Sequence, residues 1–124
     1  MSKHGSNYRG RRKEICNALP TAPGIYILWF DGLPRAYIGQ SNNIAFRVGV
    51  HLYEIDAFRG HKMRGDLDTY GWARLRASVL ETAETCNTLH EAETYWLNKY
   101  RAGGWELYNH DVSGKLHRDR ARVR

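Results

Sequence analysis

Two short apolar runs joined by a tight turn constrain the fold of this chain more than any other feature. The runs are GIYILWF (24–30) and RAYIGQS (35–41), and the turn between them is DGLP. Short runs with β-branched and aromatic residues favour strands, and glycine with proline favours a turn. The sequence therefore predicts an antiparallel β-hairpin.

Each predicted strand carries one tyrosine, Tyr26 in the first and Tyr37 in the second. One explanation is packing, because tyrosine suits a half-buried strand. The other is that the hairpin holds two phenols side by side for chemistry. The choice between these explanations depends on the rest of the chain.

The remaining pattern predicts helices and one more strand. WARLRASVL (72–80) alternates apolar with basic or polar residues, as a strand with one buried face does. A first helix is predicted over residues 9–19, ended by Pro20, and a second over 44–58, capped by Ser41, Asn42 or Asn43. A short helix is possible within 59–71. A last helix is predicted over 88–101 and is ended by Gly103-Gly104. This order predicts an α+β fold with a small central three-stranded antiparallel sheet flanked by helices.

Length and composition limit the class of protein to which this chain can belong. A chain of 124 residues with 42% hydrophobic residues predicts one globular domain. Cys16 and Cys86 have no metal-site or disulfide spacing, so we expect two buried free thiols. No apolar run is long enough to span a membrane and the N-terminus has no signal-peptide core, which predicts a cytoplasmic or nucleoid-associated protein that is not secreted.

The basic residues gather at both ends of the chain. The net charge is +6, and we divide the chain into a basic segment (1–22), a central domain (23–110) and a basic tail (111–124). Such ends are either solvated tails or binding sites for a polyanion. Charge alone does not separate DNA from RNA or from an anionic membrane surface.

The helix predicted at 44–58 places charged groups inside its apolar stripe. Arg47 and His51 are four residues apart and lie in the same stripe as Val48 and Leu52. Burying an arginine is costly without an anionic partner. Arg47 is therefore either functional or placed at the stripe edge where it reaches water, and His51 is either functional or a hydrogen-bonded core histidine.

The helix predicted at 88–101 repeats this pattern with a glutamate. Glu93 lies in the middle of the apolar stripe, whereas Glu91 lies on the opposite side and is expected to be solvated. Glu93 could form an ion pair with Arg47, or it could hold a hard cation such as Mg²⁺. Two phenols, an arginine, a histidine and a carboxylate directed at one sheet are the groups that phosphodiester hydrolysis needs.

The same residues resemble the GIY-YIG endonuclease family. Gly24-Ile25-Tyr26 and Tyr37-Ile38-Gly39 are similar to its two name-giving motifs, and the similarity extends over residues 23 to about 110. Further positions that match the family in order are Ser41, Asn42, Arg47, His51, Gly71-Trp72, Glu93, Asn109 and, as in homing-type members, His61.

The resemblance implies the GIY-YIG nuclease fold and a metal-dependent DNA endonuclease with a single-metal, tyrosine-assisted mechanism. It implies one Mg²⁺ or Mn²⁺ on Glu93, Arg47 against the phosphate, and Tyr26 as the base that activates water. Arg47 and the metal would depress the pKa of Tyr26, and His51 would pass the proton onward. Tyr37 would orient water or phosphate, and Asn109 would position Glu93 or the substrate.

The expected DNA contacts come from polar and basic residues along the chain. They are Arg11, Arg12, Ser41, Asn42, His61, Lys62, Arg74, Arg76, Arg118 and Arg120. RNA is not excluded as the substrate, and the small size is compatible with a homodimer. Two alternatives remain: a nucleic-acid-binding module on the same fold that does not cleave, and a structural protein in which Arg47 and Glu93 merely pair.

Overall fold

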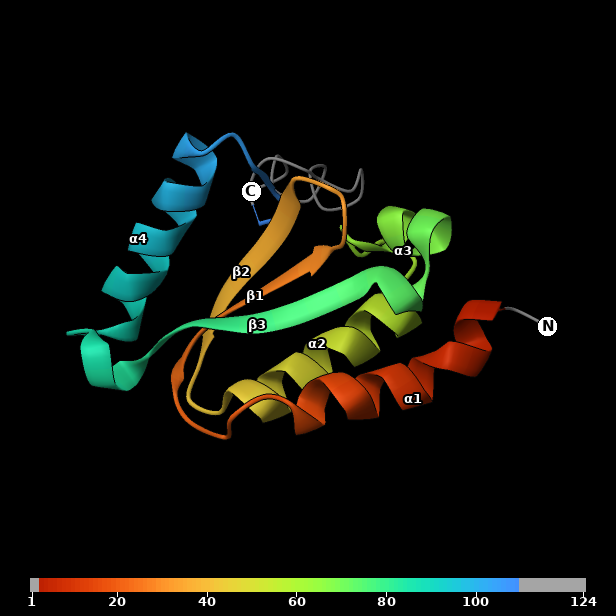
Figure 1. The fold of residues 1–124 in the computed structure, drawn as a ribbon, viewed down its shortest axis with the longest axis horizontal. Helices are drawn as coiled ribbons and strands as arrows, with labels where there is room; N and C mark the ends of the chain where they lie inside the picture. Colours follow the sequence, from red (N-terminus) through yellow and green to blue (C-terminus); the bar gives the residue numbers. More distant parts are fainter. Residues whose placement is uncertain (1–2, 110–124) are drawn as a thin grey trace, which may run out of the picture.

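The structure is a computed structural model, and it describes residues 3–109 (Figure 1). Its α-helices are α1 (Lys3–Asn17), α2 (Ile44–Ala57), α3 (Arg64–Tyr70) and α4 (Leu89–Ala102). Its strands are β1 (Gly24–Phe30), β2 (Arg35–Ser41), β3 (Leu75–Thr82) and β4 (Glu106–Leu107), and two 3₁₀ turns cover Trp72–Arg74 and Ala83–Thr85. The predicted α+β class is confirmed.

The sheet has four strands in the order β3-β1-β2-β4. β1 pairs antiparallel with both β2 and β3, as expected for the hairpin and the third strand. β4 pairs parallel with β2, so the prediction of a three-stranded, purely antiparallel sheet is wrong in this respect. A strand of two residues is too short to show an alternating pattern, and this is why the sequence did not reveal it.

Strand β1 separates two hydrophobic cores because its side chains alternate between the sheet faces. Tyr26, Leu28 and Phe30 point into the larger core, which α1, α2 and α3 complete. Ile25 and Ile27 point into the smaller core, which α4 covers. Figure 1 shows α1 and α2 on one side of the sheet and α4 on the other.

The helices that bear the candidate residues begin at defined caps. The side chain of Asn43 accepts a hydrogen bond from Phe46 N–H at the start of α2. The side chain of Thr88 accepts one from Glu91 N–H at the start of α4, which ends at Gly103. Both helices lie within one or two residues of their predicted bounds, so the face that each presents to the sheet is the predicted one.

Three expectations need adjustment. Helix α1 begins six residues earlier than predicted, at Lys3 rather than residue 9, because Gly5 and Ser6 gave no helical signal. β3 begins at Leu75, because residues 72–74 form a 3₁₀ turn first. Cys16 and Cys86 are both free thiols, as predicted, but they are half-buried.

Two further expectations concern the chain as a whole. Among the described helices none is long and apolar enough to cross a bilayer. The division at residues 22 and 110 stays a prediction, since residues 110–124 lie outside the described part of the chain.

Candidate functional site

Tyr26 and Tyr37 lie on the same face of the hairpin, toward α2. Tyr26 pairs with Gly39 across the two strands, and Tyr37 pairs with Leu28. The two phenol rings are nearly parallel, at an angle of 25°, with their centroids 6.3 Å apart. The hairpin therefore holds the two phenols side by side, which also buries Tyr26 to 1% exposure.

Each motif glycine permits a close approach that a side chain would block. A Cβ at Gly39 would lie 2.6 Å from both Cζ and Oη of Tyr26, so the phenol occupies the space above this glycine. A Cβ at Gly24 would lie 2.4 Å from the carbonyl oxygen of Glu81, so the contact between β1 and β3 needs glycine there. Real Cβ atoms do not approach other atoms so closely.

His51 reaches the phenols from α2 and is only 2% exposed. Its Nδ1 lies 3.3 Å from Tyr26 Oη, and its ring packs edge-on against Tyr37 with centroids 4.2 Å apart. Burial lowers the pKa of His51 to about 3, with smaller contributions from His61 and Arg47. His51 is therefore a neutral imidazole at physiological pH.

Arg47 lies one turn before His51 and remains 39% exposed. Its Nη1 is 4.0 Å from Glu54 Oε2 on the same helix. None of the ion pairs found within residues 3–109 joins Arg47 to Glu93. A pair between Arg47 and Glu93 therefore does not account for the charged stripes of α2 and α4.

Burial determines the acidity of the two phenols. It raises the pKa of Tyr26 above its ordinary value, the neighbouring Tyr37 raises it further, and Arg47 only partly offsets this. Burial likewise raises the pKa of Tyr37. Without a metal, the balance is thus opposite to the expected depression, because the desolvation of the phenolate outweighs the attraction of one half-exposed guanidinium.

Glu93 comes from α4 and is half-buried. Its Oε1 accepts a hydrogen bond of 3.0 Å from Gln40 Nε2, which orients the carboxylate. Its charge acts on both phenols, raising the pKa of Tyr26 and of Tyr37. Sequence reasoning missed Gln40, although strand alternation places it with Ala36 and Ile38 on the face that α4 covers.

The donor set around Glu93 suits a cation shared with a substrate. Among residues 3–109, no three His, Cys, Asp or Glu side chains come together as a metal cage. Mg²⁺ is commonly held by one or two carboxylates together with substrate phosphates and waters. A single carboxylate that Gln40 orients, and whose charge acts on both phenols, fits this kind of binding.

Asn109 contacts the backbone of β2. Its Oδ1 accepts from Ile38 N–H at 3.0 Å, and its Nδ2 donates to the Ile38 carbonyl at 2.7 Å. Lys62 Nζ in turn donates to the Asn109 carbonyl at 2.7 Å. In this structure Asn109 extends the pairing of β4 along β2, next to Tyr37, and its side-chain hydrogen bonds within residues 3–109 go to Ile38 rather than to Glu93.

His61 lies inside the protein's own hydrogen-bond network. Its Nδ1 accepts from Met63 N–H at 3.0 Å, and its Nε2 lies 3.2 Å from His51 Nε2. The sequence suggested His61 as a DNA contact, whereas the structure joins it to His51 and hence to Tyr26.

Several of the expected DNA contacts also have internal partners. Arg11 donates to the carbonyls of Trp72 and Leu75, so it fixes α1 against the start of β3. Arg74 donates to the Asp31 carbonyl, and Arg76 donates to the Ala73 carbonyl.

The other expected DNA contacts differ in their surroundings. The Ser41 hydroxyl hydrogen-bonds to both the N–H and the carbonyl of Asn43, and Asn42 is exposed. Arg118 and Arg120 lie outside the described residues.

A groove of about 690 Å³ runs between α1 and α2. Its lining contains three exposed cations, Arg9, Arg12 and Lys13, and two exposed aromatic residues, Phe46 and Tyr53, with no acidic residue. Arg12 Nε donates to the Gly49 carbonyl at 3.1 Å, which holds this side chain against α2. The groove thus combines positive charge with apolar rings.

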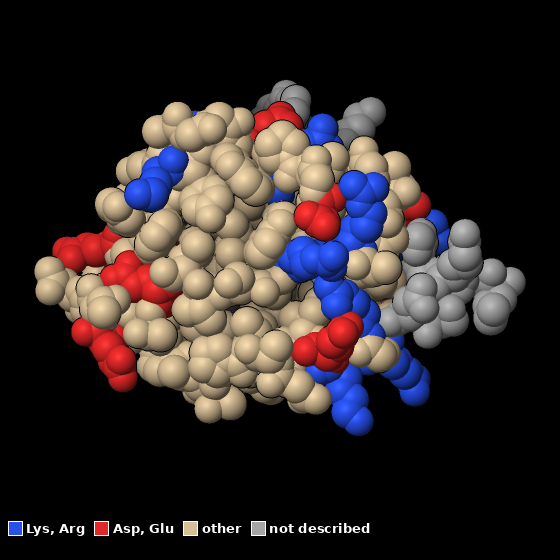
Figure 2. All heavy atoms as spheres, in the orientation of Figure 1, with Lys and Arg blue, Asp and Glu red and all other residues tan. Residues whose placement is uncertain are grey.

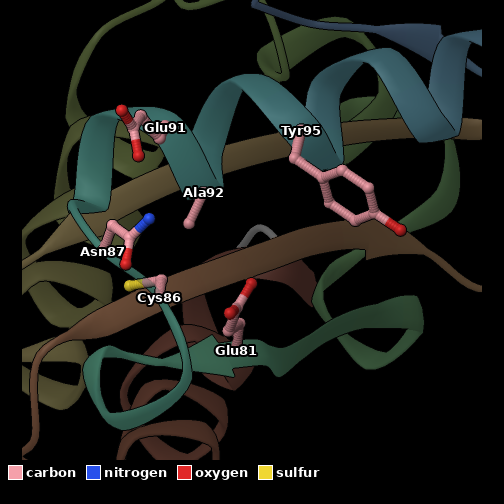
Figure 3. A pocket seen from close by; sticks show the side chains of 6 residues that line it. All are labelled: Glu81, Cys86, Asn87, Glu91, Ala92 and Tyr95. Carbon is pink, nitrogen blue, oxygen red and sulfur yellow. The ribbon is translucent and has the colours of Figure 1, made fainter.

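The surface charge is unevenly distributed. Figure 2 shows basic side chains gathered on one side of the molecule, over α1 and the start of β3, and acidic side chains at the opposite end. A smaller hollow of about 300 Å³ at the acidic end is lined by Glu81 and Glu91 (Figure 3). Glu81 Oε1 there accepts from Trp96 Nε1, so this carboxylate is part of the packing of α4.

The chain matches known proteins over most of its length. Residues 22–109 match the GIY-YIG catalytic domain. Similar solved structures include the GIY-YIG N-terminal endonuclease domain of UvrC from Thermotoga maritima bound to magnesium, with 22% identity, a TM-score of 0.43, and coverage of 82% of this chain and 94% of that chain. A point mutant of that domain, bound to the catalytic divalent cation, has 20% identity, a TM-score of 0.43, and coverage of 82% and 93%. No curated protein matches the chain.

Proposed function

The chain belongs to the GIY-YIG endonuclease family, and we propose that it hydrolyses DNA phosphodiester bonds with the help of one divalent cation. The observation that carries this proposal is the contact of Tyr26 and Tyr37, on one sheet face, with His51 of α2, and Arg47 lies one turn before His51 on the same helix. A buried cluster of this kind is expensive to maintain in a core, and function is its usual reason.

Arg47 is suited to hold the scissile phosphate. Its guanidinium is always protonated, is more than a third exposed, and can donate two parallel hydrogen bonds to a phosphate. Negative charge that grows on the phosphate during cleavage would be stabilised by this fixed cation.

Tyr26 is the candidate group for handling the attacking water. Since burial raises its pKa, the phenol is protonated at neutral pH and donates its O–H to a substrate oxygen or to water. To act as a base, Tyr26 Oη must first lose this proton, and Arg47 is the side chain that favours the loss.

This role of Tyr26 makes two predictions. Replacing Tyr26 by Phe is expected to abolish cleavage. The rate of cleavage by the wild-type protein is expected to increase between pH 7 and pH 9.

Glu93 is the residue that would hold the cation, with Gln40 orienting its carboxylate. When bound, a divalent cation supplies a positive charge against the phosphate and the leaving oxygen. We propose Mg²⁺, with Mn²⁺ as a substitute.

DNA is the proposed substrate class, and the groove between α1 and α2 is the proposed path for its backbone. The groove is positively charged, lacks acidic residues and shares α2 with the site, since Phe46 directly precedes Arg47. A palindromic target would require a two-fold dimer, and this stays a prediction.

The proposal is tested by nicking of supercoiled plasmid in Mg²⁺ or in EDTA, with a matched pair of variants on α4. Glu93→Gln removes the charge of the candidate ligand, whereas Glu91→Gln removes a charge at an exposed position two residues away. We expect metal-dependent nicking by wild type and Glu91→Gln, and loss of nicking in Glu93→Gln with an unchanged circular dichroism spectrum.

Retention of activity by Glu93→Gln would contradict this role for the carboxylate. A wild-type protein that retards plasmid on a gel but cleaves neither plasmid nor branched DNA would instead indicate the non-cleaving binding module.

A further inference from the structure

A row of hydrogen-bonding groups leads from the backbone of Met63 to the phenol of Tyr26. Met63 N–H donates to His61 Nδ1 at 3.0 Å, His61 Nε2 lies 3.2 Å from His51 Nε2, and His51 Nδ1 lies 3.3 Å from Tyr26 Oη. Both histidine rings are shielded from solvent in this row, since His51 is buried and His61 is half-buried.

The first contact fixes the direction of all the others. A backbone N–H can only donate, so His61 Nδ1 must accept and carries no hydrogen. A histidine with one unprotonated ring nitrogen is neutral, and the hydrogen of His61 is therefore on Nε2. His61 Nε2–H then donates to His51 Nε2, which must be unprotonated in order to accept. The hydrogen of His51 is consequently on Nδ1, where it faces Tyr26 Oη.

We propose that His61 is a positioning residue that holds His51 in its Nδ1–H tautomer, so that His51 donates a hydrogen bond to Tyr26 Oη. The contribution to cleavage rests on the proposed function, whereas the tautomer itself does not. Neutral histidines agree with this assignment, because burial lowers the pKa of His51 to about 3 and that of His61 to about 4.

This direction is the reverse of a path in which Tyr26 gives its proton to His51. Because Oη accepts from His51, the hydroxyl hydrogen of Tyr26 is directed away from His51. A donated N–H also stabilises negative charge on Oη. His51 therefore favours loss of the Tyr26 proton to a water molecule or a substrate oxygen rather than to His51.

Two other roles for His61 make different predictions. A DNA contact, as the sequence suggested, would affect binding of DNA rather than the rate of cleavage. A purely structural role, in which His61 only accepts from Met63 N–H, would affect stability and leave the His51 tautomer unchanged.

The tautomers are measured directly by long-range ¹H–¹⁵N correlation spectra of the whole protein labelled with ¹⁵N-histidine. The chain has six histidines, and the signals of His51 and His61 are assigned by their absence in His51→Gln and His61→Gln. We expect His61 to show the Nε2–H pattern and His51 the less common Nδ1–H pattern. An Nε2–H pattern for His51 in the wild-type protein would overturn the proposal.

Two substitutions at His61 separate its two hydrogen bonds. Asn places an oxygen near the position of Nδ1, so His61→Asn can still accept from Met63 N–H but does not reach His51. Gln places an amide near the position of Nε2, so His61→Gln can still donate to His51 but loses the bond to Met63. We expect His51 to change its tautomer in His61→Asn and to keep it in His61→Gln.

Cleavage kinetics are then measured for both variants. Removing a residue that orients a functional group through a hydrogen bond typically lowers activity by about 10–100-fold. We therefore expect kcat to fall by this factor in His61→Asn, with KM for DNA unchanged and substantial recovery in His61→Gln. A rise in KM without a fall in kcat, or equal losses in both variants, would overturn the proposal. If the wild-type protein cleaves no DNA, the proposed function fails, while the spectra still decide the tautomer.

Discussion

The space above Gly39 is what allows a buried phenol to lie between β2 and α2. We expect Gly39→Ala to fold, since its backbone is not in the left-handed region, but to displace Tyr26, whose Oη would be 2.6 Å from the new Cβ. The expected result is a loss of plasmid nicking together with about 1–3 kcal/mol of stability, as for other overpacked sites. Nicking assays and urea denaturation measure the two effects.

The matched control for this substitution is Gly65→Ala in α3. A Cβ at Gly65 meets no atom within 4 Å, and alanine is the better helix former. This variant is expected to cut DNA normally and to be at least as stable as the wild-type protein. Wild-type nicking by Gly39→Ala would show that the position of Tyr26 is not critical.

At the level of single residues, periodicity predicted which side chains share a face. It placed Tyr26 with Tyr37 and Arg47 with His51, and it separated Glu93 from Glu91. It did not identify Gln40 or His61 as partners of these groups. Those contacts depend on how α4 and the loop after α2 return to the sheet, and neighbouring residues in the sequence do not encode this.

At the level of elements, β4 and the two residues after it form a clamp on β2. We expect Asn109→Ala to lower the free energy of unfolding by about 1–3 kcal/mol, because two buried backbone groups of Ile38 lose their partners. Urea denaturation measures this, with Asn98→Ala on the exposed side of α4 as the control. An unchanged stability with cleavage abolished would instead assign Asn109 to the substrate.

The groove between α1 and α2 makes a second prediction for elements. If the DNA backbone lies in this groove, Arg12→Gln should weaken DNA binding. The slope of log Kd against log salt concentration should then fall by about 0.9, the value for one phosphate contact. Arg12→Lys keeps the charge and serves as the matched control. Equal affinities and slopes in all three proteins would exclude Arg12 from the path of the DNA.

Strand-favouring residues, alternation and helical periodicity revealed β1, β2, β3, α2 and α4. The structure confirms β1, β2, α2 and α4 within two residues and places β3 at Leu75–Thr82 instead of 72–80. The elements that differ are those without such a pattern: the start of α1 contains glycine and serine, Trp72–Arg74 turns before β3, and β4 has two residues. These depend on tertiary contacts, such as the hydrogen bonds of Arg11 to the Trp72 and Leu75 carbonyls.

For the whole molecule, the buried histidines predict a stability that depends on pH. The pKa of His51 in the folded protein, about 3, is below its unfolded value of about 6.5. The unfolded chain therefore binds more protons below pH 6.5, so the free energy of unfolding is highest above this pH and falls as the pH decreases toward 3. The expected slope from His51 is about 1.4 kcal/mol per pH unit in the lower part of this range.

Urea denaturation at several values between pH 7 and pH 4 measures this slope. We expect His51→Gln to reduce it, whereas His90→Gln, at an exposed position on α4, should leave it unchanged. A wild-type stability that is constant over this range would show that His51 is not held neutral in the folded protein.

The clamp on β2 also has a consequence for the order in which the protein is made. Ile38 and Asn109 are 71 residues apart, so the hairpin with both tyrosines leaves the ribosome long before the segment that closes its edge. Contacts between distant residues form only after the later partner has been synthesised. A nascent chain thus carries its phenols on an unclosed sheet until residue 109 has been synthesised, and the site is complete only after that point.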